Sequence, residues 1–205
     1  DHLVLFNTSA RERNELVSFE LWHPESSERG EELQHVVLRD SDGVLHPAQR
    51  VAASGLIGGD RVRFVASLRA PSLGYTSFGI ERHQNVALPT PLHVDRTCLR
   101  NEHVSLQLEE GDGLLLAPAV LMEDPSDTWS HGLVGYDDVR ATFERAELSV
   151  AEAGPIRGAL RVQSHAGRSW LEELWQLGAE ERFFQVRVRL DLQEERVAVK
   201  LRYAH

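Results

Sequence analysis

The sequence holds few residues of the kinds that build disulfide frameworks, membrane spans or nucleic-acid surfaces. Cys98 is the only cysteine among 205 residues, which argues against an internal disulfide and against any cysteine-based zinc site. No apolar run approaches the ~20 residues of a membrane helix, so no membrane partner is expected. The 22 basic residues are scattered among 32 acidic ones, and without a basic stripe no nucleic-acid partner is expected. A single thiol favours a cytoplasmic location.

Sequence motifs of two large enzyme classes are also missing. No Gly-Xaa-Ser-Xaa-Gly elbow occurs, which argues against a serine hydrolase of that type. The glycine pairs Gly58-Gly59 and Gly111-Asp112-Gly113 are typical of turns and do not match a phosphate-binding loop. The chain begins at Asp1 and its only methionine is Met122, which predicts a processed protein or a part of a larger one.

The sequence does contain many short segments with the alternation of β-strands. The strands are predicted at residues 3–7, 15–21, 34–39, 61–68, 75–80, 103–108, 113–122, 156–162, 170–177, 184–190 and 197–203. Asp42-Gly43 has the composition of a hairpin turn. The pattern predicts an all-β chain with a small β-sandwich in residues 1–81, a connection in residues 82–94 and a second β region in residues 95–205.

Some segments leave alternatives open. Residues 170–177 have apolar spacing closer to a helix than to a strand, and a strand is predicted there because strand patterns surround it. Residues 133–144 are ambiguous, since Asp137 could cap a short helix over Val139 and Phe143. Three tryptophans are predicted to lie in the core, although each could instead form a platform for a sugar ring. They are Trp22, Trp170 and Trp175.

The candidate site is the polar stretch at residues 123–132, which follows the apolar segment 114–122. Pro125 ends a strand, and Asp and Ser favour turns, so these side chains are expected on a loop. Carboxylates accept hydrogen bonds from sugar hydroxyls, and an indole packs on sugar C–H groups. The stretch is therefore a candidate carbohydrate contact, with a solvated polar loop as the alternative. The candidate residues are Glu123, Asp124, Asp127, Trp129 and His131.

Catalysis and metal binding by this stretch are not predicted. A glycosidase needs two carboxylates on either side of the bond, and Glu123, Asp124 and Asp127 supply the residue types without fixing their separation. Asp127 and His131 are four residues apart and could share a metal ion, but two ligands do not complete a site. No catalytic residue and no metal ligand is therefore assigned to this chain.

The chain opens with Leu3-Val4-Leu5-Phe6-Asn7, followed by Ser9 and Arg11. Further motifs follow in order along the chain. They are Asp42-Gly43 with Pro47 and Gln49, residues 63–66, residues 73–75, Leu99-Arg100-Asn101-Glu102, residues 111–114, residues 126–131 and residues 153–157. This ordered set resembles the C-terminal β region of glycoside hydrolase family 38 α-mannosidases. In the opening motif Thr8 replaces the family's usual proline, and no Trp follows Ser9.

The resemblance implies a fold and a division of labour. The fold is a small β-sandwich followed by the first part of a galactose-mutarotase-like β-supersandwich, truncated at its C-terminus. The nucleophile and the zinc ligands would lie in an N-terminal catalytic barrel of the same polypeptide, which acts on mannosides in mannose metabolism. This chain would then support the cleft and contribute sugar contacts, without activity of its own. The alternatives are a free-standing carbohydrate-binding module and a purely structural β scaffold.

Overall fold

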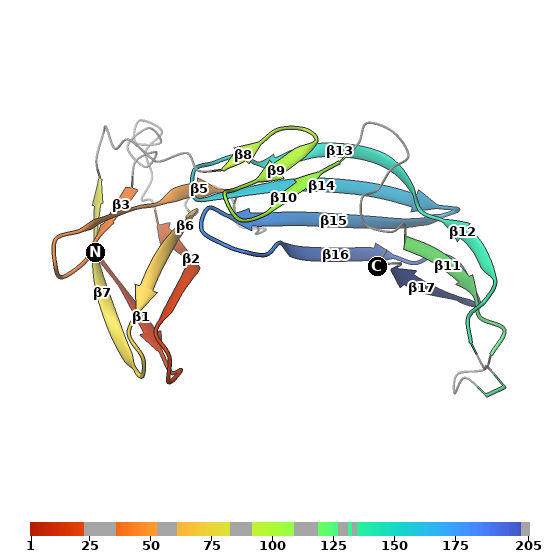
Figure 1. Ribbon diagram of the computed structural model, residues 1–205, viewed down its shortest axis with the longest axis horizontal. Helices are drawn as coiled ribbons and strands as arrows, with labels where there is room; N and C mark the ends of the chain where they lie inside the picture. Colours follow the sequence, from red (N-terminus) through yellow and green to blue (C-terminus); the bar gives the residue numbers. More distant parts are fainter. Residues whose placement is uncertain are drawn as a thin grey trace. The chain divides into compact units, whose positions relative to one another are not determined.

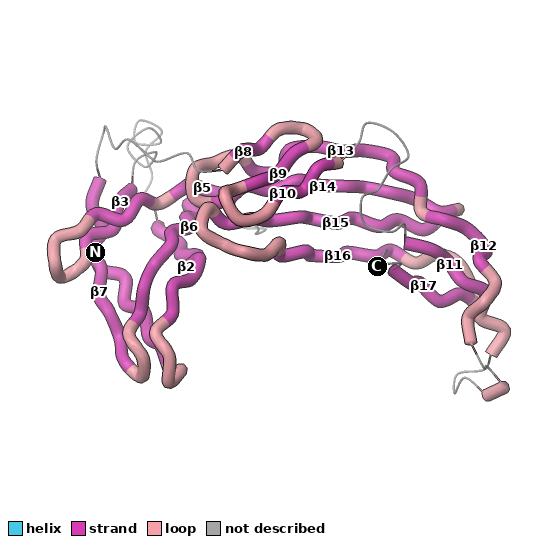
Figure 2. The backbone as a smooth tube through the Cα atoms, in the orientation of Figure 1, coloured by secondary structure: helices cyan, strands magenta, loops and turns pink. Residues whose placement is uncertain are grey.

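The computed structural model describes residues 1–22, 36–52, 61–82, 92–108, 119–126, 131–132 and 135–201. Within these ranges every regular element is a β-strand, and the strands form five antiparallel sheets, none closed into a barrel (Figures 1 and 2). The prediction of an all-β chain is thereby confirmed. This part of the chain has no helix that could cross a membrane. The chain divides into two compact units, unit 1 with Asp1–Leu92 and Gly154–Arg157, and unit 2 with the remainder.

Unit 1 contains two sheets that share one hydrophobic core. One sheet has the order β1-β7-β3-β4 and the other the order β2-β6-β5. The strands are β1 (His2–Asn7), β2 (Arg13–Trp22), β3 (Val36–Arg39), β4 (Leu45–Pro47), β5 (Gln49–Val51), β6 (Arg61–Ala70) and β7 (Gly74–Arg82). Phe64 of β6 is fully buried and stacks on Phe19 of β2, while Leu38 and Phe78 join this core from the other sheet. Burial of such side chains is the main stabilising term for the unit.

The β3–β4 hairpin is built around the predicted Asp-Gly turn. The Asp40 carboxylate accepts hydrogen bonds from the backbone N–H groups of Asp42 and Val44, at 3.0 and 2.8 Å. Gly43 has a φ of +83°, a conformation that glycine adopts without steric cost. The second Asp40 oxygen lies 2.9 Å from His46 Nε2. The turn type is therefore set by local side-chain chemistry, as the sequence indicates.

Residues Gly154–Arg157 belong to unit 1, where the Gln49 side chain binds them. Gln49 Oε1 accepts hydrogen bonds from the N–H groups of Ile156 and Arg157, each at 2.8 Å, and Gln49 Nε2 donates to the Arg157 carbonyl at 2.8 Å. Ile156 packs with Val51 and Val65 in a small apolar cluster. One buried carboxamide thus satisfies three backbone groups of a segment more than 100 residues away in sequence.

Unit 2 contains the other three sheets, with the orders β10-β9-β8, β12-β11-β17 and β13-β14-β15-β16. Figure 1 shows β13 to β16 running side by side as long strands. The strands are β8 (His93–Val94), β9 (Cys98–Arg100), β10 (Ser105–Gln107), β11 (Ala119–Glu123), β12 (Val139–Thr142), β13 (Glu144–Glu152), β14 (Arg157–Ala166), β15 (Ser169–Gly178), β16 (Gln185–Asp191) and β17 (Val197–Leu201).

The sheets of unit 2 pack through buried side chains at two places. Leu121 and Phe143 form a cluster with Ala166 and Leu171, which brings the β11 sheet against β14 and β15. A Cβ atom on Gly158 would lie 2.5 Å from Val94 Cγ2 and 3.0 Å from Leu99 Cδ1, so β14 passes very close to the β8–β9 hairpin. Glycine at position 158 is required by this close approach.

Strand β15 confirms the strand prediction for residues 170–177 over the competing helical spacing. Leu171, Glu173 and Trp175 lie on one face of the sheet, opposite Leu190, Val188 and Val186 of β16. Trp175 is buried as predicted, whereas Trp170 on the other face is 50% exposed and lies against His165. The core prediction for Trp170 is therefore wrong. Side chains alternate between the two faces of a strand, so Trp170 and Trp175, which are five positions apart, lie on opposite faces. The side chain of Trp22 lies outside the described residues.

Two further sequence interpretations need correction. Residues 139–142, considered as a short helix, form strand β12, because the backbone pairs with β11. Residues 144–152 form β13, a strand that the sequence pattern did not predict. This segment is rich in Glu and Ala, which have low strand propensity, and it becomes a strand because it pairs with β14 along most of its length.

Burial of the Glu173 carboxyl group should make the stability of the fold depend on pH. It lies on the largely apolar face of β15, and burial raises the pKa of its carboxyl group. Above the raised folded-state pKa the carboxylate is charged in both states, so the desolvation penalty is fully present. Glu173→Gln should therefore raise the melting temperature at neutral pH, and the gain should disappear as the pH falls below ~4, near the unfolded pKa of a glutamate.

Glu172→Gln is the matched control for this prediction. Glu172 is the neighbouring residue on the opposite face, where it forms ion pairs with Arg161 and Arg189 at 3.5 and 3.8 Å. Its substitution should give no gain at neutral pH. An equal response of the two variants across the pH range would contradict the role assigned to burial of Glu173.

Candidate functional site at the end of strand β11

The candidate site begins where β11 leaves the core of unit 2. β11 lies between β12 and β17, and its residues Ala119 to Met122 are buried. The strand ends at Glu123, whose backbone N–H donates to the Asp138 carbonyl at 2.8 Å. The Asp124 N–H then donates to the Arg196 carbonyl at 2.9 Å. Glu123 is the last residue of this buried strand and Asp124 is the first residue after it, so the two carboxylates are held where the strand ends.

The Glu123 carboxylate is engaged by an arginine. Arg140 Nε and Nη2 donate to its two oxygens at 2.7 and 2.6 Å, a bidentate arrangement, while Arg140 Nη1 donates to the Glu195 carbonyl at 2.9 Å. The hydrogen bonds from Arg140 hold the pKa of Glu123 below its usual range. Glu123 is therefore an ionised residue that fixes Arg140, and it lacks the raised pKa of a catalytic acid.

The Asp124 carboxylate organises the residues that follow it. One oxygen accepts hydrogen bonds from the Ser126 hydroxyl and from the Ser126 N–H, the latter at 3.1 Å. The other oxygen lies 3.4 Å from the Tyr136 hydroxyl, and Lys200 Nζ lies 4.3 Å from the centre of the Tyr136 ring. The Ser126 hydrogen bonds lower the pKa of Asp124. Both described carboxylates of the stretch are thus ionised, a state suited to accepting hydrogen bonds.

The remaining candidate residues are only partly described. His131 is exposed and lies in a turn with Gly132, which has a φ of +78°. Asp127 and Trp129 lie outside the described residues. The structure therefore brings Glu123 and Asp124 together on one strand end. Three further residues of this region, Tyr136, Arg140 and Lys200, were not singled out from the sequence, since they are distant in the chain and carry no local motif.

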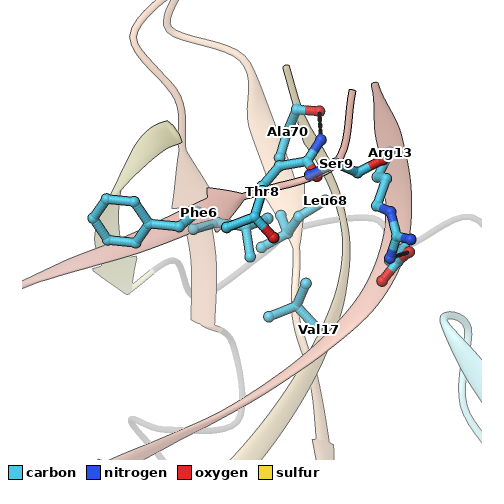
Figure 3. A pocket seen from close by; sticks show the side chains of 10 residues that line it. Phe6, Thr8, Ser9, Arg13, Val17, Leu68 and Ala70 are labelled. Atoms are coloured by element: carbon cyan, nitrogen blue, oxygen red, sulfur yellow. Dashed lines mark hydrogen bonds and ion pairs between the residues drawn. The ribbon is translucent and has the colours of Figure 1, made fainter. Parts of the chain in front are cut away.

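A hollow at one end of unit 1 is a weaker candidate for a ligand site. Figure 3 shows Thr8, Arg13, Val17 and Leu68 among the residues that line it. Arg13 is paired with Glu15 at 2.8 Å, and Asn7 donates to the backbone carbonyls of Arg11 and Pro71, each at 2.8 Å. Its volume of about 230 Å³ is below the ~300–1,000 Å³ of typical ligand pockets. We therefore assign no ligand to it.

A second cluster of side chains lies on the β8–β9 hairpin. Asp95 Oδ1 accepts hydrogen bonds from the N–H groups of Thr97 and Cys98 at 2.8 and 2.7 Å, and Asp95 Oδ2 lies 2.9 Å from His93 Nε2. The hydrogen bond from the Thr97 N–H is the leading cause that lowers the pKa of Asp95 to about 2. The sequence did not predict this cluster, because a single cysteine gives no zinc motif, whereas the cluster combines three different residue types.

A scan against protein-family models and a search of curated proteins found no match to this chain.

Proposed function

We propose that the chain is the non-catalytic C-terminal β region of a glycosidase resembling family 38 α-mannosidases. In this proposal unit 1 corresponds to the small β-sandwich, and unit 2 to the first part of the galactose-mutarotase-like supersandwich. The parent enzyme would hydrolyse terminal α-mannosides with zinc bound in a separate catalytic barrel. The chain would support the cleft of that barrel and contribute contacts to the sugar from residues 123–131.

The observation that carries the proposal is the state of the carboxylates at the end of β11. Glu123 and Asp124 are ionised, and each is bound by neighbouring side chains. An ionised carboxylate accepts hydrogen bonds from sugar hydroxyls, and neither group has the raised pKa expected of the acid in a glycosidase. The all-β organisation of the described residues also suits a β region attached to a catalytic barrel. The proposal that the sugar is a mannoside rests on the ordered motifs that resemble family 38 α-mannosidases.

A purely structural scaffold is the second candidate, and the same contacts favour it. The bidentate pair of Glu123 with Arg140 uses both oxygens of one carboxylate. A residue engaged in this way has little capacity left for a ligand. A free-standing carbohydrate-binding module is the third possibility, since it requires sugar contacts without a catalytic barrel.

Titration with methyl α-mannoside, followed by NMR, tests the sugar-binding role. We expect shifts at the indole N–H of Trp129 and at the backbone of Asp124 and His131, with a millimolar dissociation constant typical of a single weak contact surface. Trp129→Ala should abolish these shifts. Trp170→Ala, at a half-exposed tryptophan on β15, is the matched control and should leave them unchanged. A titration without shifts would favour the scaffold.

The coding sequence before Asp1 separates a region of an enzyme from a free-standing module. An in-frame α/β barrel with Asp and His metal ligands is expected. The chain alone should not hydrolyse an aryl α-mannoside, because no acid and nucleophile pair is assigned to it. Turnover by the chain, or a start codon immediately before Asp1, would contradict the proposal.

A further inference from the structure

The β8–β9 hairpin places an imidazole, a carboxylate and a thiol on one side of its two strands. His93 pairs with Arg100 and Val94 with Leu99, and the Asp95 N–H donates to the Cys98 carbonyl at 2.9 Å. Side chains alternate along a strand, so His93 and Asp95 share one side with Cys98 across the hairpin. The opposite side carries Val94 and Leu99, which pack close to Gly158. The cluster therefore follows from the register of the hairpin.

We propose that His93, Asp95 and Cys98 bind a divalent transition-metal cation of the Zn²⁺ class. One ligand atom from each residue, a ring nitrogen, a carboxylate oxygen and the thiol sulfur, lies within 4.8 Å of the other two. A tetrahedral zinc ion with bonds of 2.0–2.3 Å holds such atoms about 3.3–3.6 Å apart. Rotation of these side chains would bring their ligand atoms from separations of up to 4.8 Å to the distances that the ion requires. Three protein ligands leave a fourth position for water.

The chemistry of the three ligands selects the cation. Imidazole and thiolate favour Zn²⁺ and its neighbours in the first transition row, whereas Mg²⁺ and Ca²⁺ favour oxygen ligands alone. When the cation binds, the Cys98 sulfur forms a bond to the metal and its proton passes to solvent. This proposal departs from the exclusion of any cysteine-based zinc site that the single cysteine suggested, because Cys98 is here one of three different ligands. A mixed set with a single thiol is a different class of site.

Backbone hydrogen bonds already orient the central ligand. Asp95 Oδ1 is held by the N–H groups of Thr97 and Cys98 and by the Thr97 hydroxyl at 3.2 Å, so Oδ2 is turned toward His93. Metal-bound carboxylates commonly have such supporting hydrogen bonds, and loss of one costs about 10–100-fold in affinity. Thr97 is thus a positioning residue for Asp95. The side chains of His93 and Asp95 are 50% and 49% exposed, which gives a cation access from solvent.

Titration of the reduced chain with CoCl₂ tests the site directly. Cobalt replaces zinc in tetrahedral sites, and a cobalt–thiolate bond gives a charge-transfer band in the near ultraviolet. We expect this band to saturate at one equivalent of cobalt and to disappear when ZnCl₂ is added. Cys98→Ser should remove the band. His93→Ala and Asp95→Asn should weaken cobalt binding at least tenfold, and Thr97→Val should weaken it about tenfold.

The hairpin at Asp40 and His46 provides a matched control within the same protein. It contains a histidine and a carboxylate at 2.9 Å over a turn, as the β8–β9 hairpin does, but it has no cysteine. His46→Ala should therefore leave cobalt binding unchanged. His93 is exposed, so the folding of His93→Ala is secure even if Cys98→Ser proves unstable. Absence of the charge-transfer band, or equal cobalt binding by wild type and His93→Ala, would overturn the proposal and leave the cluster as a turn-stabilising network.

Discussion

Gln49→Ala should lower the free energy of unfolding of unit 1 by about 3 kcal/mol. Denaturant unfolding of the whole chain measures this change. The substitution leaves the N–H groups of Ile156 and Arg157 and the Arg157 carbonyl without their partner. Each buried backbone group that loses its hydrogen bond costs roughly 1–3 kcal/mol. Gln49 is itself 6% exposed, so water cannot easily replace its carboxamide without opening the segment.

A double-mutant cycle with Gly154→Ala sharpens this prediction. A Cβ atom on Gly154 would lie 2.2 Å from Gln49 Cδ, so alanine at that position forces the carboxamide away from its three partners. In the wild-type background Gly154→Ala should be about as costly as Gln49→Ala. In the Gln49→Ala background it should be close to neutral, because the clash has been removed. Additive costs would show that the two residues do not act through the same contact.

Asn101→Asp should destabilise unit 2 by about 3 kcal/mol at neutral pH. Asn101 Nδ2 donates to the carbonyls of Gly178, Ala179 and Glu181 at 3.0, 3.2 and 2.7 Å. An almost isosteric carboxylate would place a charged oxygen against three carbonyl oxygens, and leaving such groups unsatisfied costs roughly 1–3 kcal/mol each. Thermal melting of the three proteins at neutral pH measures the difference.

The pH dependence of the Asn101→Asp variant provides the control. Carbonyl oxygens raise the folded-state pKa of the new carboxyl above the unfolded value of about 3.9. The penalty is therefore complete above the folded-state pKa and shrinks as the pH falls toward 4, where the protonated group can donate one hydrogen bond. Asn101→Ala has no such group and should show no recovery. Parallel pH profiles for the two variants would contradict this account of Asn101.

Most of the longer strands and the turn at Asp42-Gly43 could be predicted because they depend on neighbours in sequence, whereas the short strands β5, β8, β9 and β12 were not predicted. Alternation defines β2 and β6 almost residue by residue, and glycine with its preference for positive φ defines the turn. β13 could not be predicted, since its composition disfavours a strand and only pairing with β14 determines its conformation. Local pattern is sufficient where side chains alternate, and insufficient where long-range pairing decides.

The candidate site shows the same limit. The sequence predicts Glu123 and Asp124 on a loop after a buried strand, whereas Glu123 is the last residue of β11. No local pattern predicts that Arg140 binds both oxygens of Glu123 from a different strand. That contact changes the chemical interpretation from an available acid to an ion-paired group. The ligand cluster on the β8–β9 hairpin was missed for a related reason. Its three residues lie within six positions of each other, yet their convergence depends on the cross-strand register.

Strand β16 has a consequence for how copies of this protein behave together. It lies at the end of the described sheet order, and all seven of its residues are exposed, with Val186, Val188 and Leu190 on one face. An exposed edge strand of this kind can pair through its backbone with the same strand of another molecule. Antiparallel pairing of two copies about Val188 would set Arg187 against Arg189 twice, and like charges directly opposite are destabilising. Repulsion between these arginines therefore opposes edge-to-edge pairing at low salt. The repulsion weakens as salt shortens the electrostatic screening length, which is about 10 Å at 0.1 M.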